Sequence, residues 1–196
     1  MKSPRVWAVL AVLVVGAADA DTWDFQALLD GKPIGTHRFV VTGPATAREV
    51  DSTASFDVKV LGIPFYKYRH TAHERWQGDC LRELHSTTDD DGKPVKVDET
   101  RDASDCVMGF AYWHPKLHEQ TRLLNPQTGK IETAQFEKMP DARLKVKGQE
   151  VDAKRWRLLA TSPAAKQELV LWLDKDDQWI GLDAQVKGRL LTYRLN

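Results

Sequence analysis

Alternation of apolar and polar side chains is the dominant pattern of the chain from Asp21 onward. In the segment 49–60, the even positions are mostly apolar and the odd positions carry charged or hydroxyl side chains. A period of two is typical of a β-strand with one face in the core and the other in water. Similar segments recur along the chain, separated by turn signals such as Asp30-Gly31 and Asp91-Gly92. The pattern predicts an all-β domain.

We expect about ten of these segments to pair with their sequence neighbours as an antiparallel meander. Such a meander curls into a barrel or half barrel, because curling limits the exposed sheet edges. The segment 115–124 differs from the rest. Pro115 suits the first turn of a helix, and Leu117, Thr121 and Leu124 recur at spacings of four and three. We therefore expect one short helix near residues 115–124.

The first twenty residues have the organisation of a cleavable signal peptide. Lys2 and Arg5 precede an apolar run over residues 6–16, and Ala18-Asp19-Ala20 has the small-x-small pattern read by signal peptidase. The run is well short of the roughly 20 residues that a permanent membrane helix needs. We expect cleavage after Ala20, a periplasmic or secreted protein, and no stable membrane span.

The remaining residues, 21–196, are long enough to form a single domain around one core. The chain has 28 Lys and Arg residues and 28 Asp and Glu residues. This overall balance implies neither a nucleic-acid partner nor an anionic membrane surface. Cys80 and Cys106 are the only cysteines. Because exported proteins keep disulfides, and because a redox motif or further zinc ligands are missing, we expect a structural bridge between them.

The histidines do not form a convincing metal or catalytic pattern. His70 and His73 are three residues apart on a predicted strand and so point to opposite faces. His114 and His118 have the spacing of two ligands on one helix face, but a third ligand is not indicated. The nucleophile elbow Gly-x-Ser-x-Gly does not occur. We expect no metal and no cofactor. The pattern favours a protein that is not an enzyme, and His70 is the one candidate base if it is one.

Aromatic side chains provide the most useful functional signal. Some share a predicted strand face with His70, and others precede the predicted helix. These rings either pack in an ordinary core or line a cavity for an apolar ligand. Ser52, His70 and Glu74 share the first of these faces and favour the cavity, because unpaired polar groups are costly in a dry core. The candidate ligand-binding residues are Tyr66, Tyr68, His70, Trp76, Tyr112, Trp113 and His114.

Several stretches of the sequence resemble one family. The most specific is residues 109–115, Gly-Phe-Ala-Tyr-Trp-His-Pro, followed by residues 120–129; residues 23–25, 29–37 and 66–70 add further matches. Together they are similar to a family of uncharacterised exported bacterial proteins, domain of unknown function 6134. The resemblance implies a curved antiparallel sheet or barrel and an exported location. It implies no enzymatic residue and no ligand.

These observations favour a periplasmic or secreted binding or carrier protein for an apolar or amphipathic, lipid-like molecule. In this hypothesis His70, Tyr68 or Tyr112 orients the polar head of the ligand. Two alternatives remain open. One is a hydrolase or isomerase that uses His70, and the other is an envelope assembly or interaction module with an exposed aromatic surface. The sequence identifies no partner protein.

Overall fold

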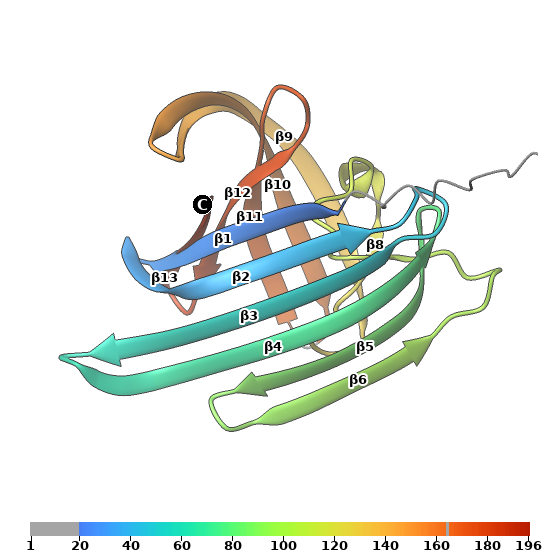
Figure 1. Ribbon diagram of the computed structural model, residues 1–196, viewed down its shortest axis with the longest axis horizontal. Helices are drawn as coiled ribbons and strands as arrows, with labels where there is room; N and C mark the ends of the chain where they lie inside the picture. The colour runs from blue at the N-terminus through green and yellow to red at the C-terminus, as the bar shows by residue number, and fades with distance from the viewer. Residues whose placement is uncertain (1–19, 164) are drawn as a thin grey trace, which may run out of the picture.

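One strongly curved sheet contains all the strands of the described residues (Figure 1). The structure is a computed structural model that describes residues 20–163 and 165–196. The predicted signal peptide, apart from Ala20, lies outside these residues. The thirteen strands are β1 (Asp21–Leu29), β2 (Lys32–Thr42), β3 (Glu49–Val60), β4 (Ile63–Gln77), β5 (Cys80–Asp90), β6 (Pro94–Thr100), β7 (Met108–Gly109), β8 (Arg122–Leu124), β9 (Ile131–Val146), β10 (Gln149–Ser162), β11 (Ala165–Leu173), β12 (Trp179–Val186) and β13 (Arg189–Leu195).

Sequence neighbours are also sheet neighbours, as expected for a meander, except that β6 and β7 form the two edges of the sheet. The order across the sheet is β6-β5-β4-β3-β2-β1-β13-β12-β11-β10-β9-β8-β7. The first and last strands pair with each other, from Phe25 opposite Leu195 to Leu29 opposite Leu191, so the two ends of the domain meet in the middle of the sheet. Every pairing is antiparallel except that of the short strands β7 and β8. The predicted all-β curved meander is confirmed, with thirteen strands and an unclosed sheet.

The gap between the two sheet edges is filled by the segment that joins β6 to β9. The amide of Leu81 on β5 donates a hydrogen bond to the carbonyl of Val107 (2.9 Å), and the Ser86 hydroxyl donates to the carbonyl of Pro126. The predicted disulfide links Cys80 at the start of β5 to Cys106, just before β7. Side-chain and loop contacts therefore close the barrel where the ladder of strand pairs does not.

The segment 115–124 does not form the predicted helix. A single 3-10 turn, Leu117–Glu119, follows Pro115, and Arg122–Leu124 then forms β8. Leu123 and Leu124 are fully buried and pair with both β7 and β9. Tertiary burial of two consecutive leucines, one toward each side of a strand, thus overrides the local helical spacing. No helix in the described ranges has the length and apolar character needed to cross a membrane.

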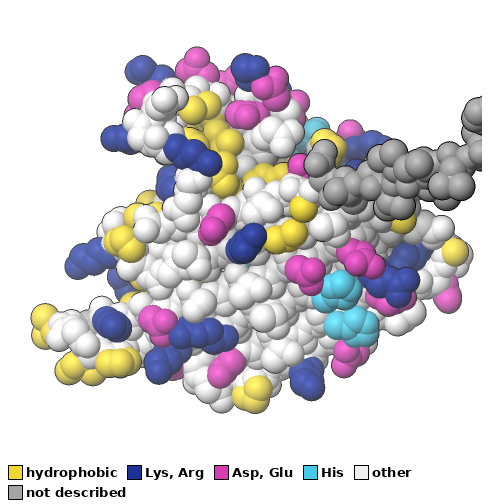
Figure 2. Space-filling view, in the orientation of Figure 1, with side chains coloured by type: hydrophobic (Ala, Val, Ile, Leu, Met, Phe, Trp, Pro, Cys, Tyr) yellow, Lys and Arg dark blue, Asp and Glu magenta, His cyan; other side chains and the backbone are white. Residues whose placement is uncertain are grey.

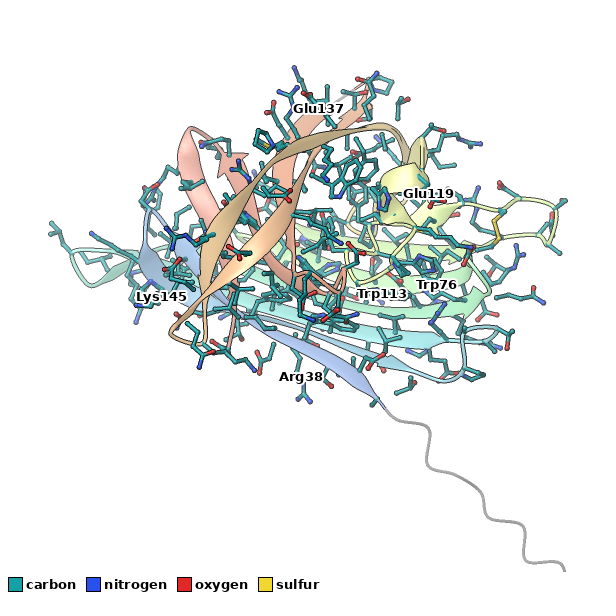
Figure 3. The ribbon with its side chains drawn as sticks, turned by 90° about the horizontal axis from the view of Figure 1, so that it is seen from above. Arg38, Trp76, Trp113, Glu119, Glu137 and Lys145 are labelled. Atoms are coloured by element: carbon teal, nitrogen blue, oxygen red, sulfur yellow. A yellow bond between two sulfur atoms is a disulfide. The ribbon has the colours of Figure 1, made fainter. Side chains whose placement is uncertain are left out.

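The concave face of the sheet carries the main core. On β3 the predicted inward positions Val50, Ala54 and Phe56 are buried, and Arg38 on β2 points to the opposite, convex side (Figure 3). The β9–β10 hairpin curls back over the sheet (Figure 1). A smaller core of Leu144, Ala153, Trp172 and Ile180 lies there, so β11 is covered on both faces, as its apolar sequence predicts.

Removing the disulfide should lower the free energy of unfolding by on the order of 3 kcal/mol, because the bond spans 26 residues of sequence. The variant is Cys80→Ala with Cys106→Ala, measured by urea unfolding. A reducing agent should bring the wild-type protein down to the stability of this variant and leave the variant unchanged. Equal stability of the two proteins without reducing agent would contradict the prediction.

Candidate functional site

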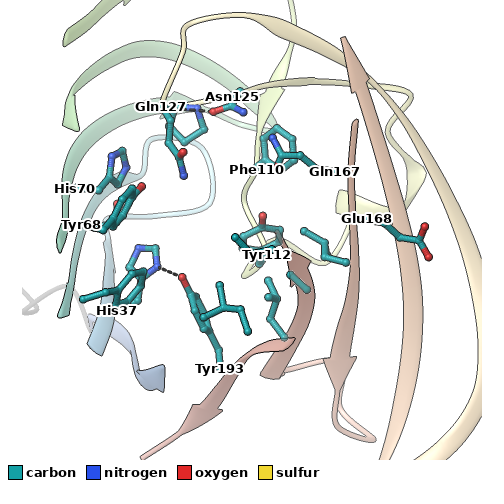
Figure 4. Close-up of a pocket in the computed structure, with 18 of the residues that line it drawn as sticks. His37, Tyr68, His70, Phe110, Tyr112, Asn125, Gln127, Gln167, Glu168 and Tyr193 are labelled. Carbon is teal, nitrogen blue, oxygen red and sulfur yellow. Dashed lines mark hydrogen bonds between the residues drawn. The ribbon is translucent and has the colours of Figure 1, made fainter. Parts of the chain in front are cut away.

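The interior of the curved sheet is not completely filled. A cavity of about 430 Å³ lies against the concave faces of β2, β3, β4, β11, β12 and β13 and the loop segments 110–112 and 125–127 (Figure 4). Its wall combines aromatic rings with histidine, carboxyl, amide and hydroxyl groups. The residues that the argument uses are His37, Ser52, Phe56, Tyr68, His70, Glu74, Phe110, Tyr112, Gln127, Leu182, Ala184, Lys187 and Tyr193.

The strand register explains why two histidines face the cavity together. His37 on β2 lies opposite Ala54 on β3, which lies opposite His70 on β4, and His70 lies opposite Thr88 on β5. Residues opposite one another in neighbouring strands point to the same face. The small Ala54 side chain between the two rings leaves space in the interior, so this row contributes two imidazoles to the cavity wall.

His37 and Tyr193 form a hydrogen-bonded pair across the sheet. Their atoms Nδ1 and Oη are 3.2 Å apart (Figure 4), and His37 Nε2 is buried without a hydrogen-bond partner among the described residues. Burial lowers the pKa of His37 to about 3, with a smaller contribution from His70. The imidazole is therefore neutral at physiological pH. Neighbouring side chains cover this nitrogen, so a molecule in the cavity would reach it only if they moved.

His70 is held by a hydroxyl group rather than by a carboxylate. Its Nδ1 lies 2.8 Å from Thr88 Oγ1, and the residue is only 4 % exposed. Burial lowers the pKa of this histidine to about 4. A general base for chemistry near neutral pH works best with a pKa close to 7. The geometry thus suits a neutral hydrogen-bonding group better than a base.

Glu74 supplies a carboxyl group farther along β4 from the β3–β4 turn. Its Oε2 accepts a hydrogen bond from the Trp76 indole (2.8 Å). Burial of the carboxyl raises the pKa of Glu74 to about 7, although the Trp76 hydrogen bond acts in the opposite direction. Near neutral pH this group therefore exists in both charge states and can accept or donate a hydrogen bond.

Aromatic rings form the apolar part of the wall. Tyr68 stacks on Phe56 with ring centres 5.3 Å apart, and Tyr112 packs on Trp179 at 5.2 Å. Burial raises the pKa of Tyr68 and Tyr112, so both hydroxyls stay protonated. Figure 4 shows these two tyrosines on opposite sides of the open space. A ligand between them would contact ring faces and phenolic hydroxyls together.

The structure divides the seven predicted binding residues into two groups. Tyr68, His70 and Tyr112 line the cavity, whereas Tyr66, Trp76, Trp113 and His114 lie outside its wall. A register shift between Arg75 and Trp76 separates Trp76 from the lining positions of β4.

Trp76 and His114 belong to the support beneath the cavity rather than to its wall. Trp76 packs edge-on against Trp113 at 5.4 Å (Figure 3) and stacks with His114 at 6.2 Å. His114 Nδ1 accepts the amide hydrogen of Lys116, and its Nε2 lies 3.3 Å from Asp79. Burial lowers the pKa of His114. These contacts hold the turn that presents Tyr112 to the cavity.

Several lining residues were not identified from the sequence. His37 follows the alternating phase of the predicted strand 36–42, two positions before the buried Phe39, so its strand phase could have revealed it. Tyr193 and Gln127 come from the last strand and from a loop, and only the closure of the sheet brings them to His37 and Tyr68. Among residues 20–163 and 165–196, no group of three or more His, Cys, Asp or Glu side chains is arranged to hold a metal ion.

Comparisons with known proteins bear on the family and on the fold. The family model described as Domain of unknown function (DUF6134) matches residues 25–196. No curated protein matches the sequence significantly.

A solved structure has the same architecture. It is the crystal structure of a beta-barrel-like protein of domain of unknown function DUF1849 from Brucella abortus, with a TM-score of 0.65 and 10 % sequence identity. The alignment covers 92 % of this chain and 96 % of that chain. At this identity, the likeness shows the fold alone.

Replacing His70 by Asn should make the free energy of unfolding less dependent on pH. In wild type, the unfolded chain holds a proton on this histidine between about pH 4 and 6.5 that the folded protein does not hold. The free energy of unfolding of wild type is therefore highest above that window, and it decreases as the pH falls through the window. The unfolding free-energy difference between wild type and His70→Asn should change by about 1.4 kcal/mol per pH unit in the window.

The measurement is urea unfolding of both proteins between pH 4 and pH 8. The difference should increase in favour of wild type up to pH 6.5 and stay constant above it. A difference that does not vary with pH would show that His70 titrates normally.

Proposed function

This chain belongs to the DUF6134 family, and we propose that it is a periplasmic or secreted binding or carrier protein for an amphipathic, lipid-like molecule. The observation that carries the proposal is the cavity of about 430 Å³ inside the sheet. Its size is within the range of about 300–1,000 Å³ typical of small-molecule sites. Its wall joins a ring-lined part to a part with hydrogen-bonding groups.

The ring-lined part supports binding of the apolar portion of the ligand. Phe56, Tyr68, Tyr112 and Leu182 contribute apolar surface to the wall. Burying about 200 Å² of apolar ligand surface contributes about 5 kcal/mol at 25 cal/mol per Å². The rings are already packed against Trp179 or against one another, so little ordering is needed when a ligand enters.

The polar part supports a head group that hydrogen-bonds without carrying a negative charge. His37, His70 and Glu74 lie in this part of the wall, and both histidines are neutral near pH 7. The lysines of the wall, Lys166 and Lys187, are exposed at the ends of hairpins. An alcohol, amide or ester oxygen therefore suits the interior better than a carboxylate or a phosphate, whose charge would lack a cation beside it.

The two alternative functions gain no specific support. His70 pairs with Thr88, and no carboxylate accepts a hydrogen bond from it in the part of the chain that the structure describes. Tyr112 faces the cavity and Trp113 is half-buried against Trp76, whereas the interaction module calls for an exposed aromatic surface at this segment. The carrier hypothesis agrees with the positions of His70 and Tyr112, which both line the cavity.

Filling the cavity should abolish ligand binding without loss of the fold. Ala184→Trp on β12 introduces an indole into the wall, and Ser52→Phe narrows the cavity from β3 on the other side. The probe is N-phenyl-1-naphthylamine, whose fluorescence rises in an apolar site. We expect each variant to bind it at least about tenfold more weakly, the loss of roughly 1.4 kcal/mol.

The matched control is Ala45→Trp in the exposed β2–β3 loop, which should bind the probe as wild type does. Melting temperatures of all variants establish that they are folded. Competition by dodecanol and by dodecanoate then compares a neutral head with an anionic one, and dodecanol should compete better. Unchanged probe binding in both folded cavity variants would refute the carrier proposal.

A further inference from the structure

The tip of the β3–β4 hairpin exposes an unusual amount of apolar surface. Leu61 is 98 % exposed, and Ile63 and Phe65 are each 69 % exposed. Residues 60–65 carry no polar side chain. The hairpin extends past its neighbours at one end of the sheet (Figure 1), and the same end carries apolar side chains in the space-filling view (Figure 2). Large apolar side chains gathered on an exposed projection indicate contact with an apolar environment.

The other turns of the same protein show that folding does not require leucine at this position. Five hairpin turns place a residue with positive φ immediately before a glycine. These are Asp30-Gly31, Leu61-Gly62, Asp91-Gly92, Lys147-Gly148 and Lys187-Gly188. Four use Asp or Lys, and only this tip uses an apolar residue. The left-handed conformation is unfavourable for leucine, and Asp tolerates it better. Leucine therefore brings no advantage to the turn itself.

The charges around the tip fit a phospholipid surface. Exposed lysines, Lys59 and Lys67, lie on either side of the apolar segment. The acidic residue before it on β3, Asp57, is already bound by the Arg69 guanidinium. Long lysine side chains can keep their ammonium groups among lipid phosphates while neighbouring apolar side chains enter the acyl region. The balanced charge of the whole chain conceals this local arrangement.

Carboxylates of the neighbouring β5–β6 turn limit the purely electrostatic attraction. Asp90 accepts a hydrogen bond from the Tyr66 hydroxyl, and Asp91 accepts one from the Lys67 amide. Insertion of the apolar side chains is therefore the main contribution, and the lysines orient the hairpin.

The β3–β4 hairpin, next to its tip, also lies beside exposed residues of the cavity wall. Lys187, in the β12–β13 turn, lines the cavity and places its ammonium group 5.7 Å from the centre of the Tyr66 ring on β4. Val186 beside it is 42 % exposed and also lines the cavity. The β3–β4 and β12–β13 hairpins therefore meet at the cavity mouth.

We propose that the β3–β4 hairpin is a membrane-docking element that inserts Leu61, Ile63 and Phe65 into a phospholipid bilayer. Docking by this tip places the cavity mouth at the lipid surface. An amphipathic ligand could then pass between bilayer and cavity with little exposure to water. The docking itself does not depend on the proposed carrier function; only the exchange of ligand does.

The test is flotation of the purified full-length protein with vesicles of phosphatidylcholine and phosphatidylglycerol. The variant Leu61→Asp with Ile63→Asp and Phe65→Asp should lose at least about tenfold in partitioning to vesicles. Its matched control places the same three charges in the β2–β3 loop as Ala45→Asp, Thr46→Asp and Ala47→Asp, and should float as wild type does. Residues 1–19 are common to all three proteins, so a difference between them reports on the hairpin.

A second measurement keeps the inference testable if the triple variant is unstable. A cysteine introduced by Leu61→Cys is labelled with the environment-sensitive dye NBD, and the label should brighten and shift to the blue when vesicles are added. The same label at Ala45→Cys should not respond. Absence of wild-type flotation, equal flotation of the tip variant, or a silent label at position 61 would overturn the inference.

Docking and ligand binding are distinguishable in these variants. The tip variant should still bind N-phenyl-1-naphthylamine in solution, and Ala184→Trp should still float with vesicles. Loss of vesicle docking would therefore not contradict ligand binding, and loss of ligand binding would not contradict docking.

Discussion

The register of one continuous strand ladder decides which side chains share the interior of this protein. Because each residue faces its partners across neighbouring strands, the row His37, Ala54, His70 and Thr88 points inward as a unit. A slip of one residue between β3 and β4 would turn His70 and Thr88 to the convex surface, while His37 and Ala54 stayed inside. The cavity, its polar groups and the low pKa values of its histidines all depend on this register.

The sheet leaves a hollow because its closure is incomplete and unequal along its length. The segment between β6 and β9 seals the region around the disulfide, where Trp76, Trp113 and His114 pack together. Toward the ends of the β3–β4 and β12–β13 hairpins, no comparable plug occupies the interior of the described residues. Glu74 lies nearer the sealed region, where the Trp76 indole donates a hydrogen bond to its carboxylate.

The two proposals assign different physical tasks to the two ends of β4. Deep positions such as His70 and Glu74 offer hydrogen bonds in a ring-lined cavity, whereas the exposed tip offers apolar surface next to lysines. A carrier of an amphipathic molecule needs both properties, because its ligand is poorly soluble in water. The fold joins them through one long hairpin, and this connection requires no moving domain.

The sequence by itself determined the all-β meander, the disulfide between Cys80 and Cys106, and the inward phase of Tyr68, His70 and Glu74. Alternation with a period of two is a local property, so it can be read without knowing what lies across the strand. The short helix over 115–124 was wrong because burial of Leu123 and Leu124 between β7 and β9 outweighed their local spacing. Only the tertiary structure decided that His37 meets Tyr193, 156 residues away, and that Trp76 and Trp113 support the cavity rather than line it. Those contacts depend on how far the sheet curls and on the register shift in β4, which are properties of the complete strand ladder and not of any single segment.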